Sequence, residues 1–179
     1  TCYQVAARHP GVDALIITGA AHRVNLLEIT RLLLNSPPAL GSLAEPAPDP
    51  LYVTTRRDWR DFLYRTANAD PEVIALDERL KQTAGVFEVP SALPYLWNGV
   101  SRTTNIPSLT VIGDHDQVFA KWAADCSSDA ALAAFERRFY GPLATVEGAV
   151  IRGAGHDLNL ERTAPETYAR MLGFCAAHS

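Results

Sequence analysis

The sequence has 179 residues, of which 47% are hydrophobic and 20% charged, and its formal net charge is −4. This length and composition are typical of one globular domain with a sizeable core, and the slight negative charge gives no basis for binding nucleic acid or an anionic membrane. No apolar run approaches the roughly 20 residues that a membrane-spanning helix needs.

The chain opens with the pattern of a helix end followed by a sheet strand. Residues 1–10 read as the end of a helix, stopped by a Pro-Gly pair. Residues 12–18, Val-Asp-Ala-Leu-Ile-Ile-Thr, then read as a buried strand of a parallel sheet. Two further stretches have the pattern of sheet strands, at 109–113 and 145–151. We therefore expect three sheet strands.

Between the first two strands, residues 20–104 depart from the sheet pattern. Helical faces are expected over 26–34, 56–67 and 71–83, whereas 36–50 holds five prolines and is expected to be a loop. Six aromatic residues of this region indicate a lid over an apolar pocket, although each one alone also fits an ordinary core. They are Tyr52, Trp59, Phe62, Phe87, Tyr95 and Trp97.

Two loops that follow strands carry residues suited to acid–base chemistry. The first, at 106–116, reads Ile-Pro-Ser-Leu-Thr-Val-Ile-Gly-Asp-His-Asp and places acids at the carboxyl end of a strand, where functional groups of open α/β sheets collect. The second, at 153–156, reads Gly-Ala-Gly-His and follows the next strand. Imidazole is the side chain best suited to proton transfer near neutral pH, so we expect an acid and a base that act as a pair.

Together, these two loops resemble the C-terminal half of the α/β-hydrolase family. The match is Pro-x-Leu-x-Val-Ile-Gly-Asp-x-Asp, followed about forty residues later by Gly-x-Gly-His. The resemblance implies an α/β fold in which His156 is the general base and Asp116 is the acid that orients it. It covers nearly the whole chain, with 1–20 and 105–179 as the core and 21–104 as a helical cap, here named the cap segment.

Other titratable residues near the loops receive lesser roles. The family pattern Gly-x-x-Asp favours Asp116 over Asp114, which is interpreted as a turn former that bonds local backbone N–H groups. Asp157 reads as a cap or surface acid, and His115 as a loop residue between the two acids. His22 follows the first strand and is interpreted as structural, with a place on the pocket wall as the alternative.

The family's nucleophile elbow, Gly-x-Ser-x-Gly, is not in this sequence. By the resemblance it would lie a few residues before Thr1. The strand at 12–18 would then present an unpaired apolar edge, which is an aggregation hazard. We therefore expect one piece of a two-piece protein, whose N-terminal half carries the nucleophile and completes the fold as a separate chain or cleaved segment. The alternative is a three-stranded domain that stands alone.

The resemblance implies acyl transfer on an apolar small molecule, as ester, lactone or amide hydrolysis or as transfer to another acceptor. An aspartate at the elbow would instead open epoxides or displace halide. Two other hypotheses stay open: autocleavage that frees Thr1 as an N-terminal nucleophile, and a hydrolase-like scaffold that only binds. No phosphate loop or nucleotide fingerprint is present, so no cofactor is expected.

The cysteines leave the cellular compartment open. Cys2, Cys126 and Cys175 have no metal-ligand spacing, so no metal is expected, and their odd number leaves at least one without a partner in this chain. No signal peptide is recognisable at the first residues, and an export signal would lie upstream. The abundance of Arg over Lys, with plentiful Ala, is typical of a bacterium with a high-GC genome.

Overall fold

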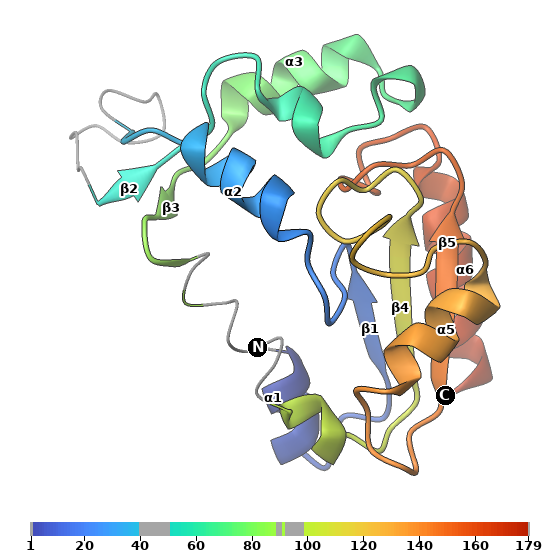
Figure 1. Ribbon diagram of the computed structural model, residues 1–179. Helices are drawn as coiled ribbons and strands as arrows, with labels where there is room; N and C mark the ends of the chain where they lie inside the picture. The colour runs from blue at the N-terminus through green and yellow to red at the C-terminus, as the bar shows by residue number, and fades with distance from the viewer. Residues whose placement is uncertain (1, 40–50, 89–90, 92–98, 179) are drawn as a thin grey trace.

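A three-stranded parallel sheet forms the centre of the structure (Figure 1). A computed structural model describes residues 2–39, 51–88, 91 and 99–178. The strands lie in the order β1-β4-β5 and are β1 (Leu15–Thr18), β4 (Ser108–Gly113) and β5 (Val146–Ile151). The register aligns Leu15 with Ser108 and Ser108 with Val146, and all strands run parallel. The three strands predicted from the sequence are confirmed.

The central strand is covered on both faces. All six residues of β4 are buried, as expected of a parallel strand between helices. On one face Val111 shares a core cluster with Phe174, and on the other Ile112 shares a cluster with Leu132. The covering helices are α6 (Ala164–Ala177) and α5 (Asp129–Arg137), respectively.

Apolar residues at helix spacing over 162–177 predict a C-terminal helix whose buried face is partly wrong; the predicted face is Ala164, Tyr168, Met171, Leu172 and Cys175. Ala164 is buried as expected, but Tyr168 and Leu172 are 47% and 69% exposed. Thr167 and Phe174 are buried instead. Met171 packs against the core as predicted, so the buried face overlaps the predicted one in part, and periodicity alone does not distinguish two apolar faces of one helix.

One edge of the sheet has no neighbour among the residues that the structure describes. β1 pairs there only with β4. The predicted N-terminal helix, α1 (Cys2–Arg8), is present, and its Tyr3 packs in a cluster with Leu15 and Ile17. The outer edge of β1 therefore offers backbone N–H and C=O groups to a further strand.

Two helices of the cap segment lie beyond the carboxyl ends of the strands (Figure 1). α2 (Leu26–Leu34) has the predicted bounds, and α3 (Pro71–Leu80) begins at the predicted proline and ends three residues early. Asn25 and Asp70 cap them by accepting backbone N–H bonds, which satisfies donors that a helix start leaves free.

The helical face predicted over 56–67 is wrong. Two short 3-10 helices, Arg60–Leu63 and Thr66–Asn68, stand there instead. Asp58 has a φ of 62°, in the left-handed region that a right-handed helix excludes. Tyr64, between the two 3-10 helices, is extended, and the segment packs against the loop that holds His156, as described below.

Some expectations fall outside the described residues, and one element was not expected. Thr1, Tyr95, Trp97 and most of the predicted loop 36–50 lie outside the described ranges. The cap segment also holds an unpredicted antiparallel pair, β2 (Tyr52–Val53) with β3 (Ala84–Gly85). Two-residue strands so far apart in the chain have too few alternating positions for a sequence pattern to reveal them.

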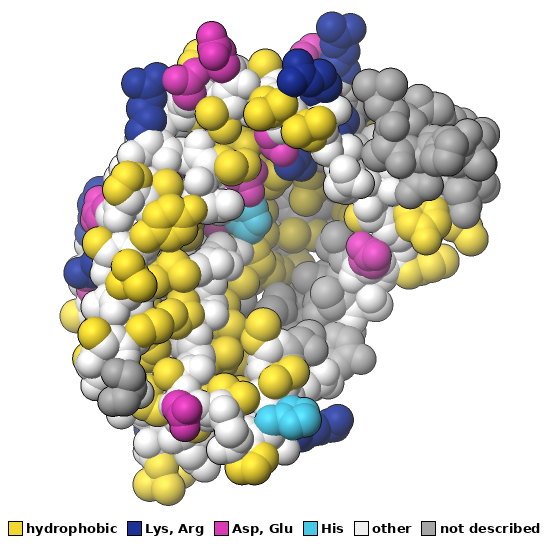
Figure 2. Space-filling view, turned by 180° about the vertical axis from the view of Figure 1, so that it is seen from behind, with side chains coloured by type: hydrophobic (Ala, Val, Ile, Leu, Met, Phe, Trp, Pro, Cys, Tyr) yellow, Lys and Arg dark blue, Asp and Glu magenta, His cyan; other side chains and the backbone are white. Residues whose placement is uncertain are grey.

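One face of the molecule is hollowed between the cap segment and the sheet (Figure 2). Hydrophobic side chains border part of this hollow. No described helix is long and apolar enough to cross a membrane. The described residues also contain no group of three or more His, Cys, Asp or Glu arranged to hold a metal ion.

Candidate active site

Asp116 and His156 form a hydrogen-bonded pair at the carboxyl ends of β4 and β5. The imidazole Nδ1 lies 2.9 Å from Oδ2 of the carboxylate. The Asp116 side chain is fully buried, whereas 27% of the His156 side chain is exposed. The structure therefore brings together the two residues that the sequence singled out as acid and base, with the base open to solvent and the acid behind it.

Backbone groups hold the Asp116 carboxylate in place. Its second oxygen, Oδ1, accepts hydrogen bonds from the N–H groups of Val118 at 2.7 Å and Phe119 at 3.0 Å. The ring of Phe119 also stacks on the imidazole of His156, with centroids 5.8 Å apart and an interplanar angle of 16°. One turn after β4 thus fixes the acid and packs against the base.

The environment of His156 favours its protonated form. Burial lowers the pKa of His156, but the hydrogen bond and the charge of Asp116, with the charge of Asp157, raise it more, so the pKa lies above its ordinary value. An imidazolium that forms during a reaction is therefore stabilised. Because Nδ1 faces Asp116 and no described residue hydrogen-bonds to Nε2, that second nitrogen is free to meet a nucleophile.

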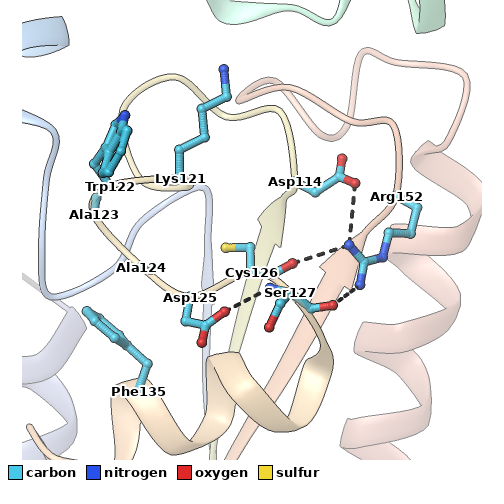
Figure 3. A pocket seen from close by; sticks show the side chains of 10 residues that line it. All are labelled: Asp114, Lys121, Trp122, Ala123, Ala124, Asp125, Cys126, Ser127, Phe135 and Arg152. Carbon is cyan, nitrogen blue, oxygen red and sulfur yellow. Dashed lines mark hydrogen bonds and ion pairs between the residues drawn. The ribbon is translucent and has the colours of Figure 1, made fainter.

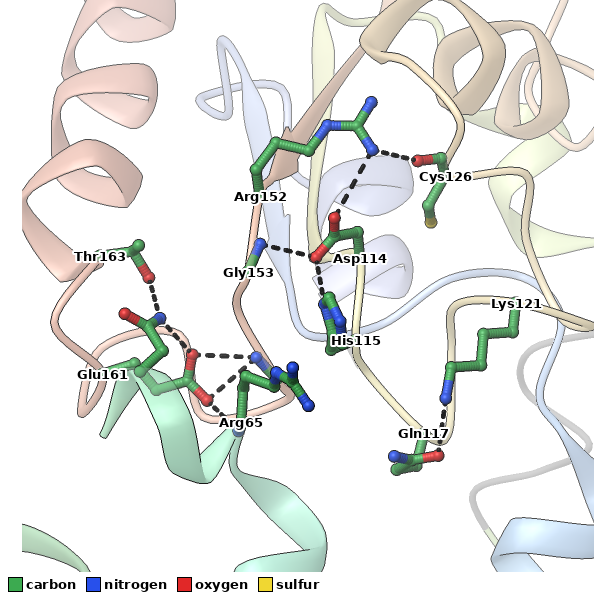
Figure 4. Close-up of polar contacts among 12 residues, drawn as sticks. Arg65, Asp114, His115, Gln117, Lys121, Cys126, Arg152, Gly153, Glu161 and Thr163 are labelled. Carbon is green, nitrogen blue, oxygen red and sulfur yellow. Dashed lines mark hydrogen bonds and ion pairs between the residues drawn. The ribbon is translucent and has the colours of Figure 1, made fainter. Parts of the chain in front are cut away.

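The acid loop and the histidine loop interlock beside this pair. Asp114 Oδ1 accepts a hydrogen bond from the Gly153 N–H at 2.7 Å, and the His115 N–H donates to the Ala154 carbonyl at 2.9 Å (Figure 4). Burial raises the pKa of Asp114, but the bonds from His115 and Gly153 lower it by more, so its pKa lies below the ordinary value. Asp114 therefore accepts a hydrogen bond from a backbone N–H group, as expected. The donor is Gly153 of the facing loop, however, and not a group of its own turn.

Gly113 allows the two loops to approach, and we expect Gly113→Ala to separate them. A Cβ atom there would overlap the carbonyl oxygens of Gly155 and Ala154. We expect a loss of about 1–3 kcal/mol in the free energy of unfolding, as for overpacking in a core, measured by urea denaturation. Gly173→Ala in α6 is the control, since no atom lies within 4 Å of its Cβ position. Equal stability of the two variants would contradict the close approach.

Asp157 departs from its expected role, whereas His115 has the role expected of it. Asp157 was expected to be a cap or surface acid, but it is half-buried and its Oδ2 is buried with no hydrogen-bond partner in the described chain. Burial raises its pKa. The surface interpretation was wrong because the cap segment covers this loop. His115 is a partly exposed loop residue, as expected. Its Nδ1 lies 2.7 Å from Asp114 Oδ1.

His22 is a structural residue. It is 1% exposed, and its Nδ1 lies 2.7 Å from Oε2 of the buried Glu136. Its ring stacks on Phe139 with an interplanar angle of 4°. This burial, pairing and stacking agree with the structural interpretation.

The structure shows three features around His156 that the sequence pattern did not indicate. One is the stacking ring of Phe119, and another is the contact made by Gly113. The third is Gly19, which has a φ of 59° and would place a Cβ 3.3 Å from the backbone oxygen of His156. A glycine directly after an apolar strand was the available signal, but its contact depends on a loop far along the chain.

A pocket of about 320 Å³ opens beside His156. Thr18 and Gly19 at the end of β1 line one part of it, and Tyr168 and Met171 of α6 line another. The pocket therefore lies between the end of β1, the His156 loop and α6.

A larger cavity of about 550 Å³ lies on the other side of Asp114 and does not include His156 (Figure 3). Arg152 crosses it, 3.6 Å from Asp114 Oδ2 and 3.3 Å from the Cys126 carbonyl oxygen, while Trp122 at its rim is 92% exposed. Burial, with nearby acids, raises the pKa of Cys126 to about 12, so its thiol is not a nucleophile at neutral pH. Cys2, Cys126 and Cys175 are all free thiols.

No protein-family model and no curated protein match the sequence. Solved structures match it at low identity over nearly its whole length. They include MenH from S. aureus (17% identity, TM-score 0.54), a thermophilic esterase from Thermogutta terrifontis (18%, 0.55) and a monoacylglycerol lipase from Paleococcus ferrophilus (13%, 0.56). Each match covers 99% of this chain, which spans only 61–64% of the matched structures. The chain therefore has the α/β-hydrolase fold, of which it forms a C-terminal portion.

Proposed function

We propose that this chain supplies the general base and its orienting acid to an acyl-transfer enzyme of the serine-hydrolase type. The observation that carries the proposal is the 2.9 Å bond between a buried Asp116 and a partly exposed His156 at the ends of neighbouring parallel strands. The names of the matched structures, among them an esterase and a lipase, support ester chemistry.

The geometry assigns a role to each nitrogen of the imidazole. Asp116 accepts a hydrogen bond from the Nδ1–H group and so selects the tautomer in which Nε2 is unprotonated. Nε2 then takes the proton of a serine hydroxyl as the oxygen attacks the carbonyl carbon, and it later delivers that proton to the leaving group. Water or another acceptor releases the acyl group by the same steps in reverse, while Asp116 stabilises the imidazolium.

The nucleophile is proposed to lie on a segment that pairs with the free edge of β1. In a parallel sheet a further strand would end beside Gly19, at the pocket into which His156 opens. A serine at that strand end would face Nε2. The share of the matched structures that this chain spans, 61–64%, supports a missing N-terminal segment, whether a separate chain or a cleaved one.

The substrate is proposed to be an apolar small molecule. α2 of the cap segment carries three leucines that are more than half exposed: Leu26, Leu27 and Leu34. Hydrophobic side chains also border the hollow between the cap segment and the sheet (Figure 2). An apolar acyl or alkyl group would find hydrophobic contacts on such a surface.

Labelling of the complete protein with a fluorophosphonate tests this proposal. We expect one adduct, located by intact mass and peptide sequencing on a serine in a Gly-x-Ser-x-Gly segment, because the reagent reacts with a serine whose proton His156 withdraws. The His156→Gln variant should not be labelled. An adduct on Thr1 would support the N-terminal nucleophile instead, and no adduct at all would favour a scaffold that only binds.

A further inference from the structure

Glu161, in the loop after His156, has a buried carboxylate that joins two parts of the chain. It is 4% exposed. Its Oε1 accepts hydrogen bonds from the backbone N–H groups of Arg65 at 2.6 Å and Gly155 at 2.9 Å (Figure 4). Its Oε2 accepts from the side-chain amide of Asn68 at 2.9 Å. One carboxylate thus bonds the residue directly before His156 and two residues of the cap segment.

Backbone bonds reinforce the same junction. The carbonyl oxygen of Leu63 accepts from the N–H groups of both His156, at 2.8 Å, and Asp157, at 3.1 Å. The Arg162 N–H donates to the carbonyl oxygen of Asn68 at 2.8 Å. The main chain on either side of the imidazole is therefore held by the cap segment, and the sheet end alone does not fix it.

N–H donors hold the charge of this carboxylate. Within the described part of the chain, Glu161 forms no ion pair, so its charge is met by N–H dipoles. A buried carboxylate without hydrogen-bond donors is strongly destabilised. Any movement of these N–H groups away from Glu161 therefore costs free energy, and this cost keeps the donor segments in position. Gly155 fits closely between them, since a Cβ there would lie 2.6 Å from the Arg65 nitrogen and 2.7 Å from Glu161 Oε1.

We propose that Glu161 is a positioning residue for His156. Its carboxylate fixes the backbone of Gly155 against the segment from Leu63 to Asn68, and this keeps the imidazole within hydrogen-bond distance of Asp116. The inference rests on the proposed function for its effect on turnover, but its effect on the titration of His156 is independent of any substrate.

Glu161→Gln in the complete protein tests the proposal. The side-chain amide of glutamine has an NH₂ group where Glu161 has one of its two oxygens. This group cannot accept a hydrogen bond from an N–H donor, so the bonds to Gly155 or to the cap segment are lost. With p-nitrophenyl butyrate as the probe, we expect kcat to fall about 10- to 100-fold, as for a small misplacement of a reacting group, with KM little changed. Because the Asp116 bond raises the pKa of His156, loosening it should lower that pKa, measured by NMR of labelled histidine.

The control is Glu166→Gln, which removes the same charge from an exposed position on α6. It should leave both kcat and the titration of His156 unchanged. An unaltered pKa of His156 in Glu161→Gln overturns the proposal, whether or not kcat falls. A fall in kcat alone could come from a general loss of stability, which does not require any change at the imidazole.

A second variant covers the case in which Glu161→Gln does not fold. Asn68→Ala removes the side-chain donor from the cap segment, together with its bond to Thr163 Oγ1, and it should lower the pKa of His156 by a smaller amount than Glu161→Gln does. No shift in this variant overturns the proposal. If the unmodified protein neither turns over the probe nor takes up the fluorophosphonate, the proposed function fails, while the histidine titration still decides the role of Glu161.

Discussion

Turnover of p-nitrophenyl butyrate by the complete protein is expected to fall about 10⁴- to 10⁶-fold in His156→Gln, the range found when the base of a catalytic triad is removed. The amide of glutamine is similar in reach to the imidazole and can still donate to Asp116. It has no basic nitrogen, however, so the nucleophile would keep its proton. The measurement is kcat under saturating substrate, with circular dichroism to establish that the variant is folded.

His115→Gln is the matched control for this substitution. His115 is also a loop histidine at the end of a strand, but it bonds Asp114 and 38% of its side chain is exposed. We expect its variant to keep a kcat close to that of the unmodified protein. If His156→Gln instead retained nearly full turnover, the base would lie elsewhere and a binding role for this site would be favoured.

Asp116→Asn is expected to reduce kcat about 10⁴-fold, the loss known for an acid that selects the histidine tautomer. The asparagine oxygen would accept the bonds from Val118 and Phe119 that Asp116 Oδ1 accepts now. Its NH₂ group would then face Nδ1 of His156 and donate to it. The remaining proton would sit on Nε2, which therefore has no lone pair to take a proton from the nucleophile.

The same variant should shift the pH dependence in a defined direction. The bond and charge of Asp116 raise the pKa of His156 against the effect of burial, so their loss lowers it. Activity through neutral imidazole increases as pH rises through this pKa, and the acid limb of kcat/KM should therefore move to lower pH in Asp116→Asn.

Asp114→Asn provides the comparison between the two acids that the sequence offered. The asparagine keeps an oxygen that can accept the hydrogen bond from the Gly153 N–H. The charge of Asp116 beside His156 is unchanged in this variant. Its acid limb should stay near that of the unmodified protein. An acid limb that moved in Asp114→Asn and not in Asp116→Asn would reverse the assignment of the orienting acid.

Much of the core could be predicted from local pattern. Apolar runs bounded by glycine and proline identified the three strands, and apolar spacing identified α2 with its observed bounds, because these signals depend on neighbours along the chain. The pairing of Asp116 with His156 also followed from the sequence, although forty residues separate them. Parallel strands that lie side by side bring their carboxyl ends, and the loops after them, to one edge of the sheet.

Contacts made by the cap segment were decided by the tertiary structure alone. The sequence of residues 56–67 predicted a helical face, but it forms two 3-10 helices that lie against the histidine loop. This packing buries Oδ2 of Asp157 and encloses the carboxylate of Glu161, and neither residue has a local pattern that distinguishes it from a surface acid. Burial of a charge depends on which distant segment covers it and which N–H groups that segment supplies.

The sequence by itself therefore determined the three sheet strands, the helix α2 and the pair of Asp116 and His156 that meets beyond the ends of β4 and β5. Only the tertiary structure decided which face of α6 is buried, that Gly113 lets two loops touch, and that Glu161 joins the cap segment to His156. The physical reason is the range of the interaction. Periodicity and turn chemistry act between near neighbours, whereas close approach and the satisfaction of buried charge act between segments that only the complete fold brings together.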